Sequence, residues 1–118
     1  MKTQYSNILA TVIIVNFNNE KFLNGCLNSV LNQSHKAKQI IVVDDNSTDK
    51  SVEVLKKYKN KITLLVNKKK TKHGSYNQIN CYYKGYLKSK GKYIFFLDSD
   101  DYFKKNKIKF VVEYLESL

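Results

Sequence analysis

Short apolar runs alternate with amphipathic segments along this chain, and the alternation predicts strands and helices in turn. Four runs rich in β-branched or aromatic residues predict strands, at residues 9–15, 39–43, 62–66 and 93–97, and the first two are typical of buried strands. Apolar residues three or four apart predict helices over residues 20–33, 75–89 and 105–118, with a further helix through Val52, Leu55 and Tyr58. The order β-α-β-α-β-α-β-α predicts one α/β domain over residues 1–118, an open, mainly parallel sheet with helices on both faces.

The same pattern predicts three local details. The helix over residues 75–89 is expected to pack through Ile79, Tyr82, Tyr83, Tyr86 and Leu87. Ser47 or Thr48 is expected to cap the helix that follows it. Gly91 is expected to end the helix over residues 75–89 as a C-cap glycine.

Polar clusters follow three of the predicted strands, at residues 16–18, 44–47 and 98–101. In open parallel sheets, ligands bind beyond the carboxyl ends of the strands. The clusters therefore predict a single binding site at one edge of the sheet.

The acidic residues in these clusters admit two interpretations. Asp98, Asp100 and Asp101 follow an apolar strand, and crowded carboxylates repel one another unless a cation joins them. On extended backbone, Asp98 and Asp100 would point to the same side and could share Mg²⁺ or Mn²⁺. The alternative is a solvated turn. Asp44 and Asp45 similarly suit either a ligand that donates hydrogen bonds or a helix N-terminus, the role expected of Asp49.

Charge and cysteine content exclude some classes of protein. The net charge is +11 and all 21 basic residues are lysine, which disfavours specific DNA or RNA recognition because such sites rely on arginine. The lysines favour general attraction to phosphates or acidic lipid headgroups, so peripheral membrane contact is one expectation. Cys26 and Cys81 are expected to be buried free thiols. No spanning segment or secretory signal is evident, so a cytoplasmic location, or the inner face of the membrane, is expected.

Glycine-rich phosphate motifs are missing from the sequence. Neither GxGxxG nor GxxxxGK[ST] occurs, so dinucleotide-binding and P-loop chemistry are not supported. The segment at 73–75 (His-Gly-Ser) could offer a helix N-terminus to a phosphate, and His73 is a weak candidate for ligand contact. The lysines at 68–70 are expected to form a solvated loop.

Four motifs, at residues 13–18, 27–33, 41–49 and 91–101, resemble the family 2 glycosyltransferases of the GT-A fold. The resemblance implies a Rossmann-like nucleotide-binding half and inverting transfer of a sugar from a nucleoside-diphosphate sugar, most simply a UDP-sugar. It also implies Mg²⁺ or Mn²⁺ as cofactor and a glycan or lipid-linked acceptor. Polysaccharide biosynthesis is the implied setting.

The resemblance also assigns site residues. Asp45, with Asp44 beside it, matches the acidic position that contacts the nucleotide base, and Phe17 stands where a stacking Tyr is usual. Asp98 and Asp100 match the DxD pair, with Asp100 as a metal ligand and Asp98 contacting ribose or metal. The full set of implied nucleotide-sugar-binding residues is Val15, Phe17, Asp44, Asp45, Asn77, Asp98 and Ser99, and the implied metal ligands are Asp98 and Asp100.

The chain departs from the family pattern in three ways. Val15 and Asn16 replace a Pro-Thr-like pair, Asn46 replaces a common Gly, and residues 76–80 lack the usual basic residue. No general base is identified, so the chain is expected to be a truncated donor-binding part, with self-association through exposed apolar surface. The alternatives are a non-catalytic nucleotide-sugar-binding fragment, a phosphoacceptor receiver domain, whose acidic pair after the first strand is missing, and a basic nucleic-acid-binding domain.

Overall fold

The computed structural model describes residues 9–68 and 74–118, with the backbone alone for residues 74–76. The elements in chain order are β1 (Ala10–Asn16), α1 (Glu20–Leu31), β2 (Gln39–Asp44), α2 (Ser51–Lys56), β3 (Thr63–Val66), α3 (Gly74–Lys88), β4 (Tyr93–Asp98) and α4 (Lys107–Glu116). Each predicted strand is confirmed to within one residue at either end. The helices are confirmed with ends that move by up to two residues, and α2 stops before Tyr58.

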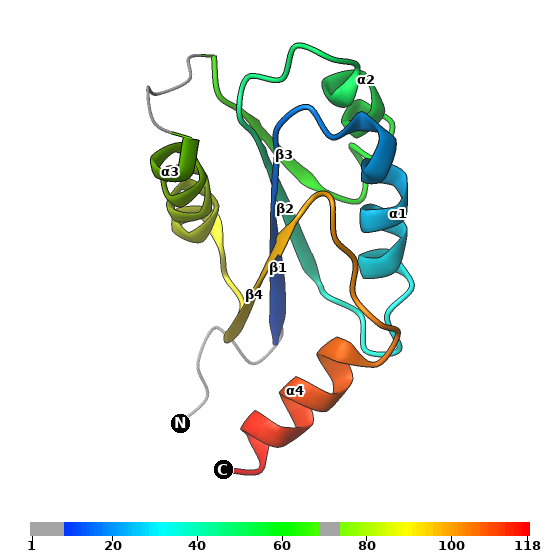
Figure 1. Ribbon diagram of the computed structural model, residues 1–118. Helices are drawn as coiled ribbons and strands as arrows, with labels where there is room; N and C mark the ends of the chain where they lie inside the picture. Colours follow the sequence, from blue (N-terminus) through cyan, green and yellow to red (C-terminus); the bar gives the residue numbers. More distant parts are fainter. Residues whose placement is uncertain (1–8, 69–73) are drawn as a thin grey trace.

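All four strands run parallel, in the order β3-β2-β1-β4. Helices cover both faces of the sheet: α1, α2 and α4 lie on one side and α3 lies alone on the other (Figure 1). The predicted α/β class, with an open parallel sheet and helices on both faces, is therefore confirmed. Parallel order also places the carboxyl ends of all four strands along one edge.

The larger core lies between the sheet and the α1 side. It joins alternate residues of the strands to Leu23, Leu27 and Val30 of α1 and to Ile108 and Val112 of α4. One face of β1, β2 and β4 is thereby buried against helices, whereas β3 at the sheet edge is only partly covered.

Gln33 is a buried polar residue in this core, with 1% of its surface exposed, and it joins α1 to the start of α4. Its amide nitrogen donates to the carbonyls of Ser29 at 3.0 Å and Lys104 at 2.6 Å. Its amide oxygen accepts from the N–H of Ile108 at 3.0 Å. Because every polar atom of the amide is satisfied, Gln33 can be buried at low cost and can cap α4.

The expected packing side of α3 is wrong except at Tyr82, which packs, partly buried, against the smaller core. Ile79, Tyr83, Tyr86 and Leu87 are each more than half exposed. The side that meets the sheet instead consists of small or polar residues four apart: Asn77, Cys81 and Gly85. A Cβ on Gly85 would lie 2.5 Å from Cγ2 of Ile13, so the helix lies too close to β1 for a larger side chain.

The two predicted caps are also wrong. Helix α2 begins at Ser51, beyond Ser47 and Thr48, and its first N–H, that of Ser51, donates to Asp49 at 2.9 Å. Helix α3 ends at Lys88, before Gly91, and no glycine in the described residues has a positive φ. A glycine is needed at position 91 because the backbone there passes close to β1. A Cβ on Gly91 would lie 2.7 Å from the backbone nitrogen of Thr11.

Both cysteines are buried and unpaired, as expected. Burial, reinforced by the nearby carboxylates of Asp101, Asp100 and Asp98, raises the pKa of Cys26 to about 12. Burial, with the neighbouring Asp45, raises the pKa of Cys81 to about 11. Both thiols therefore remain protonated at neutral pH. Among the described residues, none of the helices has the length and apolar character needed to cross a membrane.

Candidate functional site

Three polar side chains line up at the carboxyl edge of the sheet, on the face covered by α3. Asn67 follows β3, Asp45 follows β2 and Asp98 ends β4. Side chains alternate between the two faces of a strand, and each of these three has the parity that faces α3. Contacts with α3, given below, confirm this placement. Phe17, which is 39% exposed, follows β1 between Asp45 and Asp98 in strand order.

Asp98 is held by two donors from α3. The amide of Gln78 donates to Asp98 Oδ1 at 2.7 Å, and the hydroxyl of Tyr82 donates to the same oxygen. Burial first, and then this hydrogen bond to a carboxylate, raises the pKa of Tyr82 well above its usual value. Tyr82 therefore remains a proton donor, and it fixes Asp98 in an orientation that leaves Oδ2 without a hydrogen-bond partner among the described residues.

Asp45 is nearly buried, with 5% of its surface exposed, and it lies in a second polar network with α3. The amide nitrogen of Asn67 lies 3.3 Å from Asp45 Oδ1 and 3.3 Å from Sγ of Cys81. The nearby carboxylate of Asp45 also helps to raise the pKa of the Cys81 thiol. The ammonium of Lys84 donates to the amide oxygen of Asn67. The orientation of Asp45 is thus set by β3 and α3 together.

Asp44 has the opposite parity and a different environment. It is fully buried and accepts from the Asn16 amide at 2.8 Å, the Ser47 hydroxyl at 2.7 Å and the Ser47 N–H at 2.9 Å. Asn46, between them, adopts a left-handed conformation with φ of 58°. An Asp at this position closes the turn with its own side chain, and asparagine tolerates the positive φ that the turn requires. Asp44 therefore stabilises the conformation of the loop that contains Asp45.

The loop after β1 is tied to the loop after β2. Asn18, also left-handed with φ of 52°, accepts from the N–H of Thr48 at 2.8 Å through its side chain. Its own N–H donates to the Ser47 hydroxyl at 3.0 Å. These bonds hold the two loops as one unit beside Phe17 and Asp45.

The acidic run after β4 differs from the extended arrangement that the sequence suggested. The N–H of Asp101 donates to the carbonyl of Asp98 at 3.0 Å, so the chain turns directly after the strand. Asp98 faces α3, whereas Asp100 and Asp101 lie along a groove on the α1 side. The expectation of an extended segment through Asp98 and Asp100 is wrong, because the chain turns at Ser99 and Asp100.

Ser99 and Val15 support this turn from within. Ser99 is fully buried; its N–H donates to the carbonyl of Val15 at 3.1 Å, and its hydroxyl accepts from the Asn19 amide at 3.0 Å. Val15 is itself buried in β1. Asn77, 3% exposed, lies in the first half of α3. His73 and the lysines at 69–70 lie outside the described residues, so the structure gives no position for these candidates.

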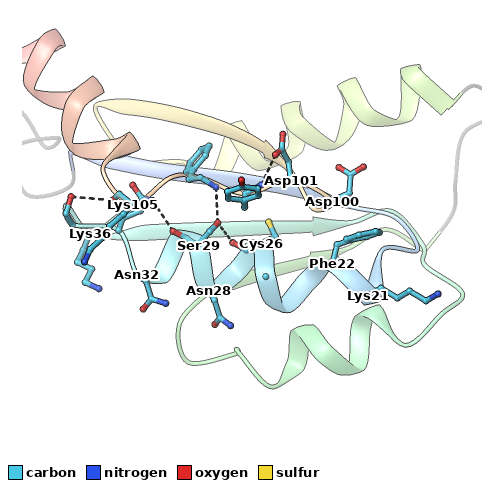
Figure 2. A pocket seen from close by; sticks show the side chains of 15 residues that line it. Lys21, Phe22, Cys26, Asn28, Ser29, Asn32, Lys36, Asp100, Asp101 and Lys105 are labelled. Carbon is cyan, nitrogen blue, oxygen red and sulfur yellow. Dashed lines mark hydrogen bonds between the residues drawn. The ribbon is translucent and has the colours of Figure 1, made fainter.

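A groove of about 850 Å³ separates α1 from the segment that follows the acidic turn. Asp100 and Asp101 lie at one end of it near Phe22 and Lys21, and Lys36 and Lys105 lie at the other (Figure 2). The row of Asn67, Asp45 and Asp98 is on the opposite face of the sheet. The acidic turn thus reaches both the groove and this row.

The donors at the acidic turn suit a hard divalent cation shared with a ligand. In the described part of the chain, no three His, Cys, Asp or Glu side chains are arranged to hold a metal by themselves. Asp98 and Asp100 are exposed carboxylates at one turn, and Mg²⁺ or Mn²⁺ commonly takes one or two carboxylates plus phosphate oxygens. The residues therefore fit a cation that binds together with a phosphorylated ligand.

Four side chains of the site were not predicted from the sequence: Asn67, Gln78, Tyr82 and Lys84. Asn67 has a detectable signal, because it follows a strand just as Asp45 does and has the same parity. Gln78 and Tyr82 are one turn apart on α3, and they are recognised only once α3 is known to pack through its less apolar side.

Comparison with known proteins agrees with this geometry. Residues 11–118 match the family described as Glycosyl transferase family 2. The poly(ribitol-phosphate) beta-N-acetylglucosaminyltransferase TarS of Staphylococcus aureus strain Mu50 is 32% identical over 108 residues, which are 90% of this chain and 18% of TarS. The Escherichia coli UDP-Glc:alpha-D-GlcNAc-diphosphoundecaprenol beta-1,3-glucosyltransferase WfaP is 33% identical over 109 residues, 92% of this chain and 42% of WfaP.

The crystal structure of S. aureus TarS 1-349 in complex with UDP is also similar. It superposes with a TM-score of 0.77 at 29% identity, over 93% of this chain and 32% of that one. The mannosyltransferase PcManGT of Pyrobaculum calidifontis shares the fold, with a TM-score of 0.65 at 16% identity over 81% of this chain and 28% of that one. The chain thus spans less than half the length of the relatives compared.

The parallel sheet, with carboxylates at the carboxyl ends of β2 and β4, defines an α/β protein of the GT-A type. Within that class, the chain belongs to glycosyltransferase family 2.

Proposed function

We propose that this chain is the donor-binding part of an inverting glycosyltransferase, and that it binds a nucleoside-diphosphate sugar, with UDP-sugars as the first candidates. The supporting observation is the row of Asp45 and Asp98 at one sheet edge, where Asn67 after β3 holds Asp45 and Gln78 of α3 holds Asp98. In the proposed site the base lies at Asp45, beside Phe17, and the diphosphate lies at the acidic turn. The UDP complex of the similar TarS structure supports the choice of UDP.

The residues of this chain have separable tasks in the proposed site. Asp45 accepts a hydrogen bond from the base, and Asp98 accepts from the ribose or binds the cation. Asp100, exposed at the turn, completes the cation site together with phosphate oxygens. A divalent cation bound there would offset charge on the departing nucleoside diphosphate as the glycosidic bond breaks. The acceptor is proposed to be a glycan or a lipid-linked sugar, in line with the activities for which TarS and WfaP are named.

Calorimetric titration with UDP, with and without Mn²⁺, tests this proposal. Saturable binding that strengthens when Mn²⁺ is added is the expected result. Binding of UDP that is undetectable at millimolar concentration, with Mn²⁺ present, would contradict the donor site itself.

The variant Asp100→Ala tests the cation role separately. We expect it to lose most of the strengthening by Mn²⁺, about tenfold in affinity or about 1.4 kcal/mol, and to bind UDP without metal as the unaltered protein does. Glu113→Ala on α4 is the matched control, because it removes an exposed carboxylate far along the chain from the turn. If Asp100→Ala responds to Mn²⁺ as fully as this control, Asp100 is not a ligand.

A further inference from the structure

We infer that Asn67 and Lys84 act as positioning residues that fix the carboxylate of Asp45 and thereby determine which nucleobase the site accepts. The inference rests on the proposed function, which puts the base at Asp45. Neither residue belongs to the motifs that define the family resemblance. Their role follows from the contacts that join β3 and α3 at the edge of the sheet.

The backbone of Asn67 is fixed by the sheet. Its N–H donates to the carbonyl of Asp44 at 2.8 Å, which extends the pairing of β3 with β2 by one step. The Asn67 side chain is therefore delivered to the face of α3 next to Asp45. Its amide nitrogen lies 3.3 Å from both Asp45 Oδ1 and Sγ of Cys81.

Lys84 sets the direction of this amide. An ammonium group can only donate hydrogen bonds, so the oxygen of the Asn67 amide must face Lys84, which donates to it. The NH₂ group must then face Asp45 and Cys81. Burial and the nearby Asp45 raise the pKa of Cys81 and keep it a neutral thiol, which the NH₂ group contacts at 3.3 Å. We call this chain of contacts, from Lys84 through Asn67 to Asp45, the relay. It fixes the orientation of the nearly buried Asp45 carboxylate, which can then accept a hydrogen bond from a ligand.

An oriented carboxylate discriminates between bases by hydrogen-bond type. Uracil presents an imide N–H, which a carboxylate accepts. Cytosine presents an unprotonated ring nitrogen at the same position. The lone pair of this nitrogen repels the carboxylate, because both groups are hydrogen-bond acceptors. A site with a fixed buried acceptor rejects a ligand that lacks the matching donor, whereas a carboxylate free to rotate can turn away. The relay should therefore affect the preference for UDP over CDP more than the affinity for nucleotides in general.

The experiment compares the dissociation constants of UDP and CDP for Asn67→Ala and Lys84→Met, with Mn²⁺ present throughout. The matched controls are Asn60→Ala, in an exposed turn, and Lys88→Met, one turn further along α3. We expect a preference for UDP of about tenfold or more in the unaltered protein, reduced several-fold in Asn67→Ala and in the same direction in Lys84→Met. Both controls should keep the original ratio.

The outcomes separate this inference from the proposed function. If the unaltered protein binds neither nucleotide, the proposed function fails. If it binds UDP but the ratio of UDP to CDP affinity is the same in Asn67→Ala and Lys84→Met as in the controls, the positioning role alone is overturned. Equal affinity of the unaltered protein for UDP and CDP would also overturn it. Lys84 is exposed, so its variant gives an answer even if Asn67→Ala folds poorly.

Discussion

Asp49 is a single residue that serves the starts of two helices. Its Oδ1 accepts from the N–H of Ser51 at 2.9 Å, at the start of α2, and its Oδ2 accepts from the N–H of Glu20 at 3.1 Å, at the start of α1. The first N–H groups of a helix have no partner within it, and a carboxylate there also interacts favourably with the helix dipole. One side chain therefore joins the two helices that flank the loops of the proposed base site.

We predict that Asp49→Ala lowers the free energy of unfolding by about 1–2 kcal/mol, because both caps are lost. Chemical denaturation followed by circular dichroism measures this change. Glu53→Ala, which removes an exposed carboxylate in the first turn of α2, is the control and should change the stability little. Equal effects of the two variants would show that the Asp49 bonds contribute nothing beyond charge.

The same residue predicts a pH dependence. Burial opposes ionisation of Asp49, but hydrogen bonds from Ser51 and from the backbone N–H of Glu20 outweigh it and hold the pKa below 3.8. A carboxyl group whose pKa is lower in the folded protein stabilises the fold above its unfolded pKa and loses this contribution as the pH falls through the folded pKa. The stability difference between the unaltered protein and Asp49→Ala should thus shrink as the pH is lowered below 3.8. A difference in stability that stays constant with pH would contradict the lowered pKa of Asp49.

At the scale of elements, the sequence predicted the sheet better than it predicted α3. Continuous apolar runs leave little choice but buried strands, so β1, β2 and β4 are found where expected. In α3 the most apolar stripe, which includes Ile79 and Leu87, faces away from the sheet. Hydrophobic periodicity cannot identify the packing side of a helix when the residues on that side, here Cys81 and Gly85, are small and not strongly apolar.

The candidate site also has a part that the sequence predicts and a part that it does not. Strand parity alone separates Asp45, on the α3 face, from Asp44, which closes its own turn. That distinction was available from the sequence. The turn after Asp98 was not, because its backbone bond to Asp101 depends on the support that Ser99 receives from the loop after β1. Long-range contacts of this kind leave no local pattern.

The close approach of α3 to the sheet gives a prediction for that element. Gly85→Ala would place a Cβ 2.5 Å from Cγ2 of Ile13, a branched and fully buried side chain. We expect the variant to lose about 1–3 kcal/mol of stability, measured by denaturant titration. The shift of α3 should also weaken UDP binding, since α3 bonds Asp98 directly and reaches Asp45 through Asn67.

Gly25→Ala is the matched control for this variant. Gly25 lies within α1, and nothing is found within 4 Å of a Cβ added there. Alanine should therefore stabilise the protein by up to about 1 kcal/mol, because it restricts the unfolded chain and favours the helix. If both glycine variants gain stability, the packing of α3 against β1 is looser than its contacts indicate.

At the scale of the whole molecule, the net charge of +11 bears on how a charged ligand arrives. A positive field raises the local concentration of anions, and salt screens it within about 10 Å at 0.1 M and about 30 Å at 0.01 M. UDP is a polyanion, whereas uridine carries no charge.

We therefore predict that the affinity for UDP falls several-fold between about 20 and 300 mM NaCl, mostly through slower association. The affinity for uridine, measured by NMR titration, should stay nearly constant over the same range, because its contacts in the proposed site are confined to the base and ribose. Parallel salt dependence of the two ligands would mean that salt acts on the fold or on the base contacts, and that the lysine-rich surface does not attract the diphosphate.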